Sequence, residues 1–570
     1  MSLSSLFLNK YGPKPLTRLF RSPFISLVER RIINSSAEIR KNPDWIALID
    51  NEEERKRWSE MAAEKFGTTP TDMEYIFEEL AYYKTLQENC QGTMVLGGAG
   101  MVWVNDVPDD NQLLREVKHY AAVLEAHPKQ KIELKDNATL MLIDPLLYPL
   151  DYELSHLLPS PIESPAAALR VSTFGDRPGS FEAWSKVVAE LNKDIKTEDN
   201  IYTDCDQGNG FCWLPTDIRV NADGSVGIKS YINNLHPIHH SSFYATLSKV
   251  LERTIPLFEQ VLTDLVHPTN VRVSVDDYEC VHFTAPHPND VDWDEVDLNV
   301  EEDDIWEAWE QGIVYTEPVP GAFVEPDRPL VPYSLRGEAL QVVVEMKNMH
   351  LTPENPEYKP FRSHGVNRWQ NSGIPNDNIV ATSIWYYDID NMDISGIEFR
   401  DPIGAYEELD YINSILEKKT FSYVYGESND IGKGFGYEQV AGSTEIKSGR
   451  VVCFPNSYQY LRSSVKLADP SKPGHVKMLL FHLVHPGVRL PSTSIVAPQQ
   501  QDWWIKDAFA TSPLKGLPRE LCHMIQQKVN MPMSLEKARK KYLDPNGLHL
   551  RYEGESEIYN TYIHYGDIIG

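Results

Sequence analysis

The stretch Leu340-Gln-Val-Val-Val-Glu-Met346 opens a strand-rich region that closes with Met478-Leu-Leu-Phe-His-Leu-Val484. Three further runs lie between them: Asn378-Ile-Val-Ala-Thr-Ser-Ile-Trp-Tyr-Tyr-Asp388, Ser395-Gly-Ile-Glu-Phe-Arg400 and Gly449-Arg-Val-Val-Cys-Phe-Pro-Asn456. Each run is rich in β-branched and aromatic residues and is bounded by Gly, Pro, Asn or Asp, which is typical of antiparallel strands joined by turns. We therefore predict a small β-barrel or jelly roll, with a mouth in which a small molecule can bind.

Length and charge limit the domain organisation and the partners that the whole chain can have. The chain has 570 residues, enough for two or three packed units or one large merged unit. Its 83 acidic and 54 basic residues give a net charge of −29. This charge argues against nucleic acid or an anionic membrane as a partner. A small-molecule substrate is the expected partner, because the predicted barrel has a mouth in which one can bind.

Cysteine usage indicates the compartment. Six cysteines are scattered without a Cys-x-x-Cys pair, which fits a reducing environment and speaks against a disulfide framework or a structural zinc site. No run approaches the roughly 20 apolar residues of a membrane span. We expect a soluble, cytoplasmic protein; the alternative is an organelle transit segment, because residues 1–28 are basic, rich in serine and free of acids.

The chain divides into four expected regions. We predict a mainly helical N-terminal region over 1–160, a mixed α/β region over 161–335, the jelly-roll barrel over 336–510 and a helical tail over 511–570. Helical periodicity is clearest at 52–66, 72–86 and 241–266. The predicted fold class is therefore α+β.

Several phrases in a fixed order carry a resemblance to a known family. They are Cys212-Trp-Leu-Pro-Thr-Asp217, Tyr231-Ile-Asn-Asn-Leu-His-Pro237, His350-Leu-Thr-Pro-Glu-Asn-Pro-Glu-Tyr358, Ile379-Val-Ala-Thr382, Phe454-Pro-Asn456, Lys472-Pro-Gly-His475 and Asp502-Trp-Trp504. With them the chain resembles a large fungal family of unknown function that is related to the iron(II)/2-oxoglutarate dioxygenases. The resemblance implies that the barrel is a double-stranded β-helix of the cupin-like type.

In that superfamily an iron(II) ion is held by a His-x-Asp/Glu pair and a distant His, and a basic residue anchors the co-substrate. The family's Trp-His-x-Glu-Gly falls on Trp369-Gln-Asn-Ser-Gly373, so the first two ligand positions are Gln370 and Ser372. The distant histidine falls on Tyr460 and the anchoring arginine on Val476. These neutral side chains cannot supply the charge and basicity that hold iron(II). The resemblance thus implies a degenerate metal site with no metal and no cofactor.

Two alternatives remain open. An active iron(II)/2-oxoglutarate dioxygenase would need a rebuilt ligand set, for which His364, His475 and Asp377 are the candidates. A binding protein without catalysis is the second alternative.

The main hypothesis is an iron-independent enzyme that carries out cyclisation, isomerisation, dehydration or hydrolysis on a small fungal metabolite of secondary metabolism. Tyr460 and Asp377 are the candidate general acid and base. The candidate substrate-binding residues are Gln370, Ser372, Asn376, Tyr386 and His482.

Overall fold

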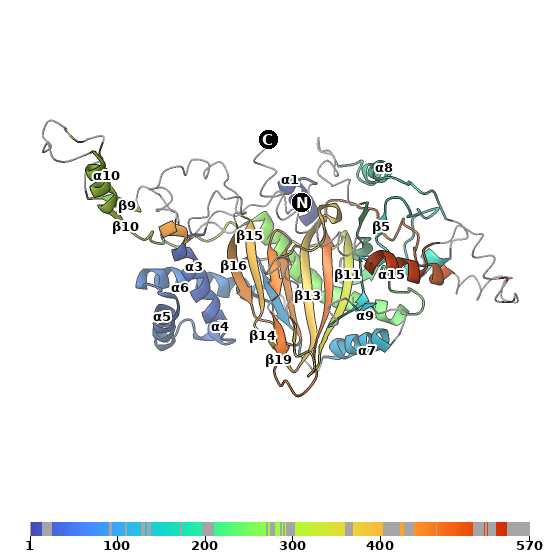
Figure 1. Cartoon of the computed structure of the whole chain (residues 1–570), viewed down its shortest axis with the longest axis horizontal. Helices are drawn as coiled ribbons and strands as arrows, with labels where there is room; N and C mark the ends of the chain where they lie inside the picture. The colour runs from blue at the N-terminus through green and yellow to red at the C-terminus, as the bar shows by residue number, and fades with distance from the viewer. Residues whose placement is uncertain are drawn as a thin grey trace.

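We describe the fold from a computed structural model of the whole chain (Figure 1). The structure describes residues 2–13, 25–90, 94–108, 111–126, 132–133, 138–170, 174–195, 210–268, 272–273, 280–284, 288, 291, 302–358, 369–402, 422–426, 438–462, 464–504, 518, 521 and 532–543.

A ten-stranded sheet forms the centre of the molecule. Its strands pair antiparallel in the order β1 (Met94–Leu96), β2 (Trp103–Asp106), β17 (Arg450–Pro455), β13 (Ile379–Asp390), β20 (Gly474–Val484), β11 (Ala339–Leu351), β4 (Thr139–Ile143) and β3 (Ile132–Glu133). β7 (Thr216–Val220) also pairs with β11, and β8 (Val226–Ile228) pairs with β7. The strands predicted at 340–346, 378–388, 449–456 and 478–484 are confirmed as β11, β13, β17 and β20.

Helices cover one face of this sheet. α9 (Ser241–Val266) packs against β2, β8, β13 and β17, and α7 (Gln112–Ala126) packs beside it against β4 and β13. Trp103 on β2 donates its indole N–H to the Asp264 carboxylate of α9 at 2.7 Å. The long apolar face of α9 is what allows the central strands to be buried on this side.

Two small sheets accompany the central one: β16–β15–β18 (Glu438–Thr444, Ile397–Pro402 and Gln459–Arg462) and β12–β19–β14 (Glu357–Tyr358, Val465–Leu467 and Met392–Ile394). Phe454 of β17 joins the layers, because its ring centroid lies 5.0 Å from that of Phe399 on β15 and 5.1 Å from that of Tyr460 on β18. The central sheet and the β16–β15–β18 sheet therefore pack together through aromatic side chains.

The expected barrel is corrected in one respect: the described strands form separate sheets and do not close into a barrel. The reason lies at the strand edges. β17 uses its outer edge to pair with β2, and β11 uses its outer edge to pair with β4 and β7. The architecture is thus a mixture of helices and antiparallel sheets.

The N-terminal helices have a core of their own around Ile32, Trp45 and Ile76. The helices around this core are α3 (Leu27–Arg40), α4 (Trp45–Leu48), α5 (Glu52–Phe66) and α6 (Pro70–Glu88), whereas α1 (Leu3–Tyr11) packs against α9 in the main core. The helices predicted at 52–66 and 241–266 are confirmed as α5 and α9, and the one at 72–86 lies within α6.

The remaining described elements are β5 (Leu150–Asp151), η1 (Pro165–Leu169), α8 (Phe181–Leu191), β6 (Phe211–Cys212), β9 (Val281–Phe283), α10 (Glu302–Gln311), β10 (Ile313–Tyr315), η4 (Pro375–Asp377) and α15 (Leu535–Leu543). Of these, α8, α10 and α15 lie at the periphery (Figure 1), whereas η4 is buried directly before β13. Among the described helices, none combines the length and the apolar character that crossing a membrane requires.

Candidate functional site

A cluster of polar side chains occupies the face of the central sheet that lies towards the β16–β15–β18 sheet, which we call the inner face. Strand register places Thr382 of β13 opposite His482 of β20, and Thr382 also lies opposite Phe454, which faces the second β layer. His482 in turn lies opposite Val343 of β11, and Glu345 follows Val343 by two residues, so it shares the same face. The cluster thus comes from neighbouring strands that meet only in the folded chain.

Hydrogen bonds connect the members in a line. The Thr382 hydroxyl lies 3.1 Å from His482 Nδ1, and His482 Nε2 lies 3.2 Å from Glu345 Oε2. The ammonium group of Lys347 forms an ion pair with the other oxygen of the Glu345 carboxylate. Because a carboxylate only accepts, His482 Nε2–H donates to Glu345, and Nδ1 accepts the hydrogen bond from the Thr382 hydroxyl.

Burial sets the charge of each group. Thr382 and His482 are 0% and 1% exposed. Burial lowers the pKa of the His482 imidazole, so it is neutral near pH 7. Burial raises the pKa of the Glu345 carboxyl, but the charge of Lys347 and the hydrogen bond from His482 outweigh this effect. The resulting pKa of Glu345 lies far below its usual range. The cluster therefore contains an ammonium, a carboxylate, a neutral imidazole and a hydroxyl.

Asp377 and Asn376 lie in η4, directly before β13, and support the cluster from behind. Asp377 Oδ1 accepts the Trp213 backbone N–H at 2.6 Å, and Oδ2 accepts the Ile374 N–H at 2.8 Å. The Trp213 ring lies 4.9 Å from the His482 ring. Asn376 donates to the Tyr152 hydroxyl at 3.1 Å. In this structure the Asp377 carboxylate fixes the loop that carries Trp213 against His482.

The structure places Gln370, Ser372 and Tyr460 in one neighbourhood. Gln370 and Tyr460 form an antiparallel bridge, with backbone N–H to O distances of 3.1 and 2.9 Å. The backbone of Ser372 exchanges two hydrogen bonds of 2.8 Å with the Asn456 side chain. The Ser372 hydroxyl is buried and has no hydrogen-bond partner within the described part of the chain. A cavity shared by these three side chains remains a prediction.

Tyr386 lies on the same inner face, four residues after Thr382. It is opposite Met478, which is in turn opposite Lys347. Its side chain is 1% exposed. Tyr386 and His482, both predicted to bind substrate, thus belong to one face of the sheet.

The candidates for a rebuilt iron site are not brought together. His364 lies outside the described residues. Asp377 precedes the start of β13, whereas His475 pairs with Asp390 at its end, so roughly 40 Å of strand separates them. His475 donates instead to Asp388 at 2.8 Å, among charged groups near α7.

The donor set that the structure describes does not fit iron(II). Among the described residues, no three His, Cys, Asp or Glu side chains lie together in a way that could hold a metal ion. Glu345 and His482 form a pair of donors, but the Lys347 ammonium already neutralises that carboxylate. Two donors beside a fixed cation are not the three-ligand site that non-haem iron(II) uses.

Sequence reasoning missed Glu345, Lys347 and Thr382 as functional candidates. A signal was present, because Glu345 and Lys347 interrupt the apolar run of β11 at alternate positions. Charges spaced by two residues in a strand share one face, and a buried strand accepts them only when they are paired.

Residues 70–507 match the model of a family described as a protein of unknown function, DUF4246. No curated protein matches the chain.

Three solved structures show distant likeness. A selenomethionine-labelled Fe(II)/(alpha)ketoglutarate-dependent dioxygenase, TqaL, is 10% identical over 67% of this chain and 92% of its own, with a TM-score of 0.19. IDO from Bacillus thuringiensis is 8% identical over 26% of this chain and 46% of its own, with a TM-score of 0.15. A bsmA homologue from Methylobium petroleophilum PM1 is 9% identical over 27% of this chain and 45% of its own, with a TM-score of 0.16.

The last two matches span less than half of the matched proteins' own length, and scores of this size carry no argument about function. The family model, in contrast, spans most of the chain. This protein therefore belongs to the DUF4246 family, whose function is unknown.

Proposed function

We propose that this protein is an iron-independent enzyme that performs acid–base chemistry on a small molecule between two β layers of jelly-roll type. The observation that carries the proposal is the buried hydrogen-bonded line Thr382–His482–Glu345. A hydroxyl, an imidazole and a carboxylate in this order are the parts of a catalytic relay.

The energetics of burial support a functional role. Removing an ammonium and a carboxylate from water is costly, and apolar residues of similar volume are often equally or more stabilising at such positions. The sheet nevertheless keeps Glu345, Lys347 and His482 together in an otherwise apolar interior. Ionisable groups with strongly shifted pKa values that share one location are candidates for catalysis.

The hydrogen bonds suggest how protons would move. His482 Nδ1 would take the proton of the Thr382 hydroxyl as its oxygen attacks a carbonyl carbon or accepts a substrate proton. Glu345 would stabilise the imidazolium that results, and Lys347 would hold the Glu345 carboxylate in its ionised form. The leaving group would depart with a proton from His482 or Tyr460, and a water molecule activated by the His482 imidazole would then cleave the acyl–Thr382 ester. Hydrolysis is therefore the reaction that the relay supports best among those considered.

The exposed end of the cluster suggests the direction of approach. The side chains of Lys347 and Glu345 are 11% and 10% exposed, whereas that of His482 is 2% exposed. A substrate would therefore enter from the Lys347 end of the cluster. Tyr460, across the layer beside Phe454, is the proposed proton donor, and Gln370, Ser372, Asn376 and Tyr386 are proposed to line the substrate site.

The test compares two variants at one position. Wild-type protein is incubated with a small-molecule mixture in the presence of a metal chelator and without 2-oxoglutarate, and turnover is followed by mass spectrometry. Thr382→Val removes the hydroxyl and keeps the shape, so turnover should fall about 10²–10⁴-fold, whereas Thr382→Ser should retain it. Tyr460→Phe should lower turnover to a similar extent if the phenol donates a proton.

Three results would contradict the proposal. Full activity of Thr382→Val, with the thermal midpoint of the wild type, would remove the relay from the mechanism. A requirement for iron with formation of succinate would instead indicate a rebuilt dioxygenase site. Binding of a small molecule without turnover by any variant would indicate a binding protein.

A further inference from the structure

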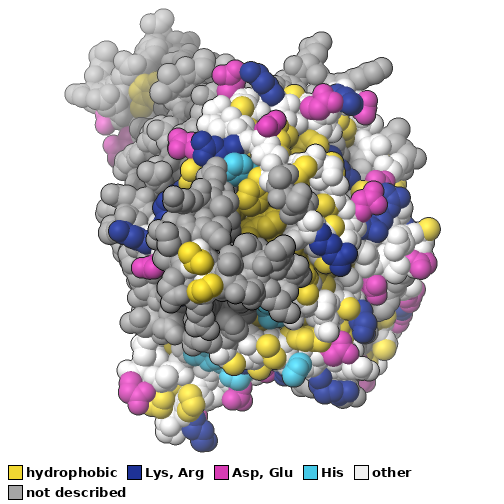
Figure 2. Space-filling model, turned by 90° about the vertical axis from the view of Figure 1, so that its right-hand side faces the viewer, with side chains coloured by type: hydrophobic (Ala, Val, Ile, Leu, Met, Phe, Trp, Pro, Cys, Tyr) yellow, Lys and Arg dark blue, Asp and Glu magenta, His cyan; other side chains and the backbone are white. Residues whose placement is uncertain are grey.

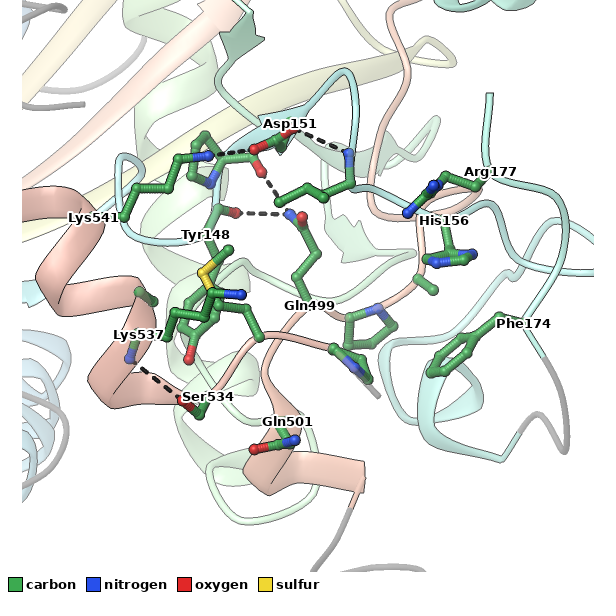
Figure 3. Close-up of a pocket in the computed structure, with 17 residues that line it drawn as sticks. Tyr148, Asp151, His156, Phe174, Arg177, Gln499, Gln501, Ser534, Lys537 and Lys541 are labelled. Carbon is green, nitrogen blue, oxygen red and sulfur yellow. Dashed lines mark hydrogen bonds and ion pairs between the residues drawn. The ribbon is translucent and has the colours of Figure 1, made fainter. Parts of the chain in front are cut away.

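A second site lies apart from the sheet interior, on the side of the molecule that carries α15. A cavity of about 430 Å³ lies between the loop around Asp151, the segment that includes Phe174 and Arg177, the segment 497–501 and the start of α15 (Figure 3). None of its lining residues belongs to the Thr382–His482–Glu345 cluster.

The cavity wall carries more positive than negative charge. Arg177, Lys537 and Lys541 are its cations, and Asp151 is its carboxylate. Asp151 is already occupied, because it pairs with Lys541 at 2.5 Å and accepts the backbone N–H groups of Glu153 and Leu154 at 3.0 Å. Lys537 and Arg177 have no carboxylate partner among the residues that the structure describes.

This balance is unusual for a chain with a net charge of −29. Figure 2 shows this side of the molecule, on which Lys and Arg side chains lie next to hydrophobic ones. Two uncompensated cations at a concave surface raise the local concentration of anions and repel cations.

Other lining groups are apolar or can still form hydrogen bonds. Phe174 packs edge-on against Trp504, with ring centroids 4.8 Å apart, and Leu154 is 43% exposed. His156 makes one long contact, from Nδ1 to the Gly175 carbonyl at 3.5 Å, which leaves its Nε2 without a partner among the described residues. Figure 3 shows His156 and Phe174 near Arg177, across the cavity from Lys537 on α15.

Rigid contacts hold the floor of the cavity. The Gln499 amide donates to the Tyr148 and Pro149 carbonyl oxygens at 3.0 and 2.6 Å, and its oxygen accepts the Ser155 hydroxyl at 2.8 Å. The amide is thus fully used by the protein itself. This part of the cavity wall is therefore held in place before any ligand binds.

We propose that this cavity binds a small organic anion with an apolar, ring-sized body, attracted by Arg177 and Lys537. The apolar body would lie against Phe174 and Leu154, and His156 would donate or accept a hydrogen bond at the anionic group. This site is separate from the proposed catalytic cluster and does not depend on it.

The experiment uses the full-length protein and a matched pair of fluorescent probes. The first is 8-anilinonaphthalene-1-sulfonate, an aromatic anion, and the second is N-phenyl-1-naphthylamine, which has the same rings without the sulfonate. The sulfonate probe should bind with one site per chain and at least about tenfold more tightly than the neutral probe. Raising the salt concentration should weaken its binding, because exposed charges are screened.

Variants then locate the site. Arg177→Gln with Lys537→Gln should weaken binding of the sulfonate about five- to tenfold, the effect expected for two partly exposed charge contacts. The control, Lys56→Gln with Arg57→Gln, removes the same charges from exposed positions of α5, which Figure 1 shows on the opposite side of the molecule from α15. The control should bind like the wild type.

Three outcomes would overturn the proposal. They are equal affinity of the two probes, equal effects of the two double variants, and absence of saturable sulfonate binding. All substituted side chains are exposed, so thermal unfolding of each variant should match the wild type. If a variant unfolds early, a competition experiment on the wild type takes its place, with octanoate and octanol as competitors of the sulfonate probe. Only octanoate should displace the probe. Equal displacement by octanol would overturn the proposal.

Discussion

Lys347 and Glu345 are two charged residues of one strand that are buried together, and each compensates the charge of the other. Alternation along β11 places both side chains on the inner face, where their ion pair is about one-tenth exposed. His482 donates to the remaining carboxylate oxygen, so each oxygen of Glu345 has a partner. The stability of the cluster therefore depends on its members together.

The first prediction concerns this pair. Glu345→Leu leaves the Lys347 ammonium buried without its counter-charge and should lower the free energy of unfolding by about 3–5 kcal/mol. Glu345→Leu with Lys347→Met replaces the whole pair by apolar groups and should recover most of that loss. Urea denaturation of the single and double variants measures both values. A double variant as unstable as the single one would show that the ion pair itself is not the reason for the loss.

At the scale of elements, α7 is attached to the central sheet by charges as well as by apolar packing. Lys118 of α7 pairs with Asp388 of β13 at 2.8 Å, and Glu125 of α7 lies 3.1 Å from His350 of β11. His475 of β20 also contacts Asp388, at 2.8 Å. The first two contacts connect the helix to β13 and β11, and the third joins β20 to the carboxylate that binds Lys118.

The second prediction is the acid sensitivity of this attachment. Burial raises the pKa of Asp388, but the hydrogen bonds from His475 and Lys118 outweigh it and lower the pKa to about 2. A carboxyl group with a lowered folded-state pKa contributes stability above its unfolded pKa of about 4, and loses that contribution as the pH falls towards 2. Between pH 5 and 2 the wild type should therefore lose on the order of 1–2 kcal/mol more than Asp388→Asn.

Thermal unfolding over this pH range makes the comparison. Asp393→Asn serves as the control, because Asp393 forms a pair with Lys466 in which both side chains are more than half exposed. Its pH profile should follow the wild type. Identical profiles for all three proteins would mean that the Asp388 contacts contribute nothing to the acid response.

At the scale of the whole molecule, the central sheet is shared between distant parts of the chain. β11, β13, β17 and β20 come from residues 339–484, but their outer neighbours β2, β4 and β7 come from residues 103–220. α9 covers the face opposite the polar cluster. The strands of the predicted 336–510 unit thus complete both their edges and one face with other segments.

The third prediction follows from this sharing. A fragment of residues 336–510 should not fold cooperatively, because it would expose the edges of β11 and β17 and the apolar face that α9 covers. Circular dichroism during urea denaturation should show one cooperative transition for the full chain and a gradual change for the fragment. A sharp transition of the fragment would instead show that it is an independent domain.

The sequence alone predicted the elements well, since an element depends on neighbours along the chain. The run from 241 to 266 repeats apolar residues with helical spacing and forms α9, and the β-branched runs form β11, β13, β17 and β20. The resemblance placed Gln370 and Tyr460 at ligand positions of one site, and the structure pairs their backbones, but a cavity shared by their side chains stays a prediction. In each case the information lies in a short segment or in an ordered set of phrases.

Only the tertiary structure decided which segments pair with the outer edges of the central strands and which polar groups meet. Sheet edges are taken by β2, β4 and β7 because those segments pack there in the folded chain, which no local pattern specifies. Likewise, the contact of Thr382 with His482 joins residues 100 positions apart and depends on strand register. A shift of one residue in that register would turn His482 to the other face of the sheet, so the cluster exists only as a consequence of the packed fold.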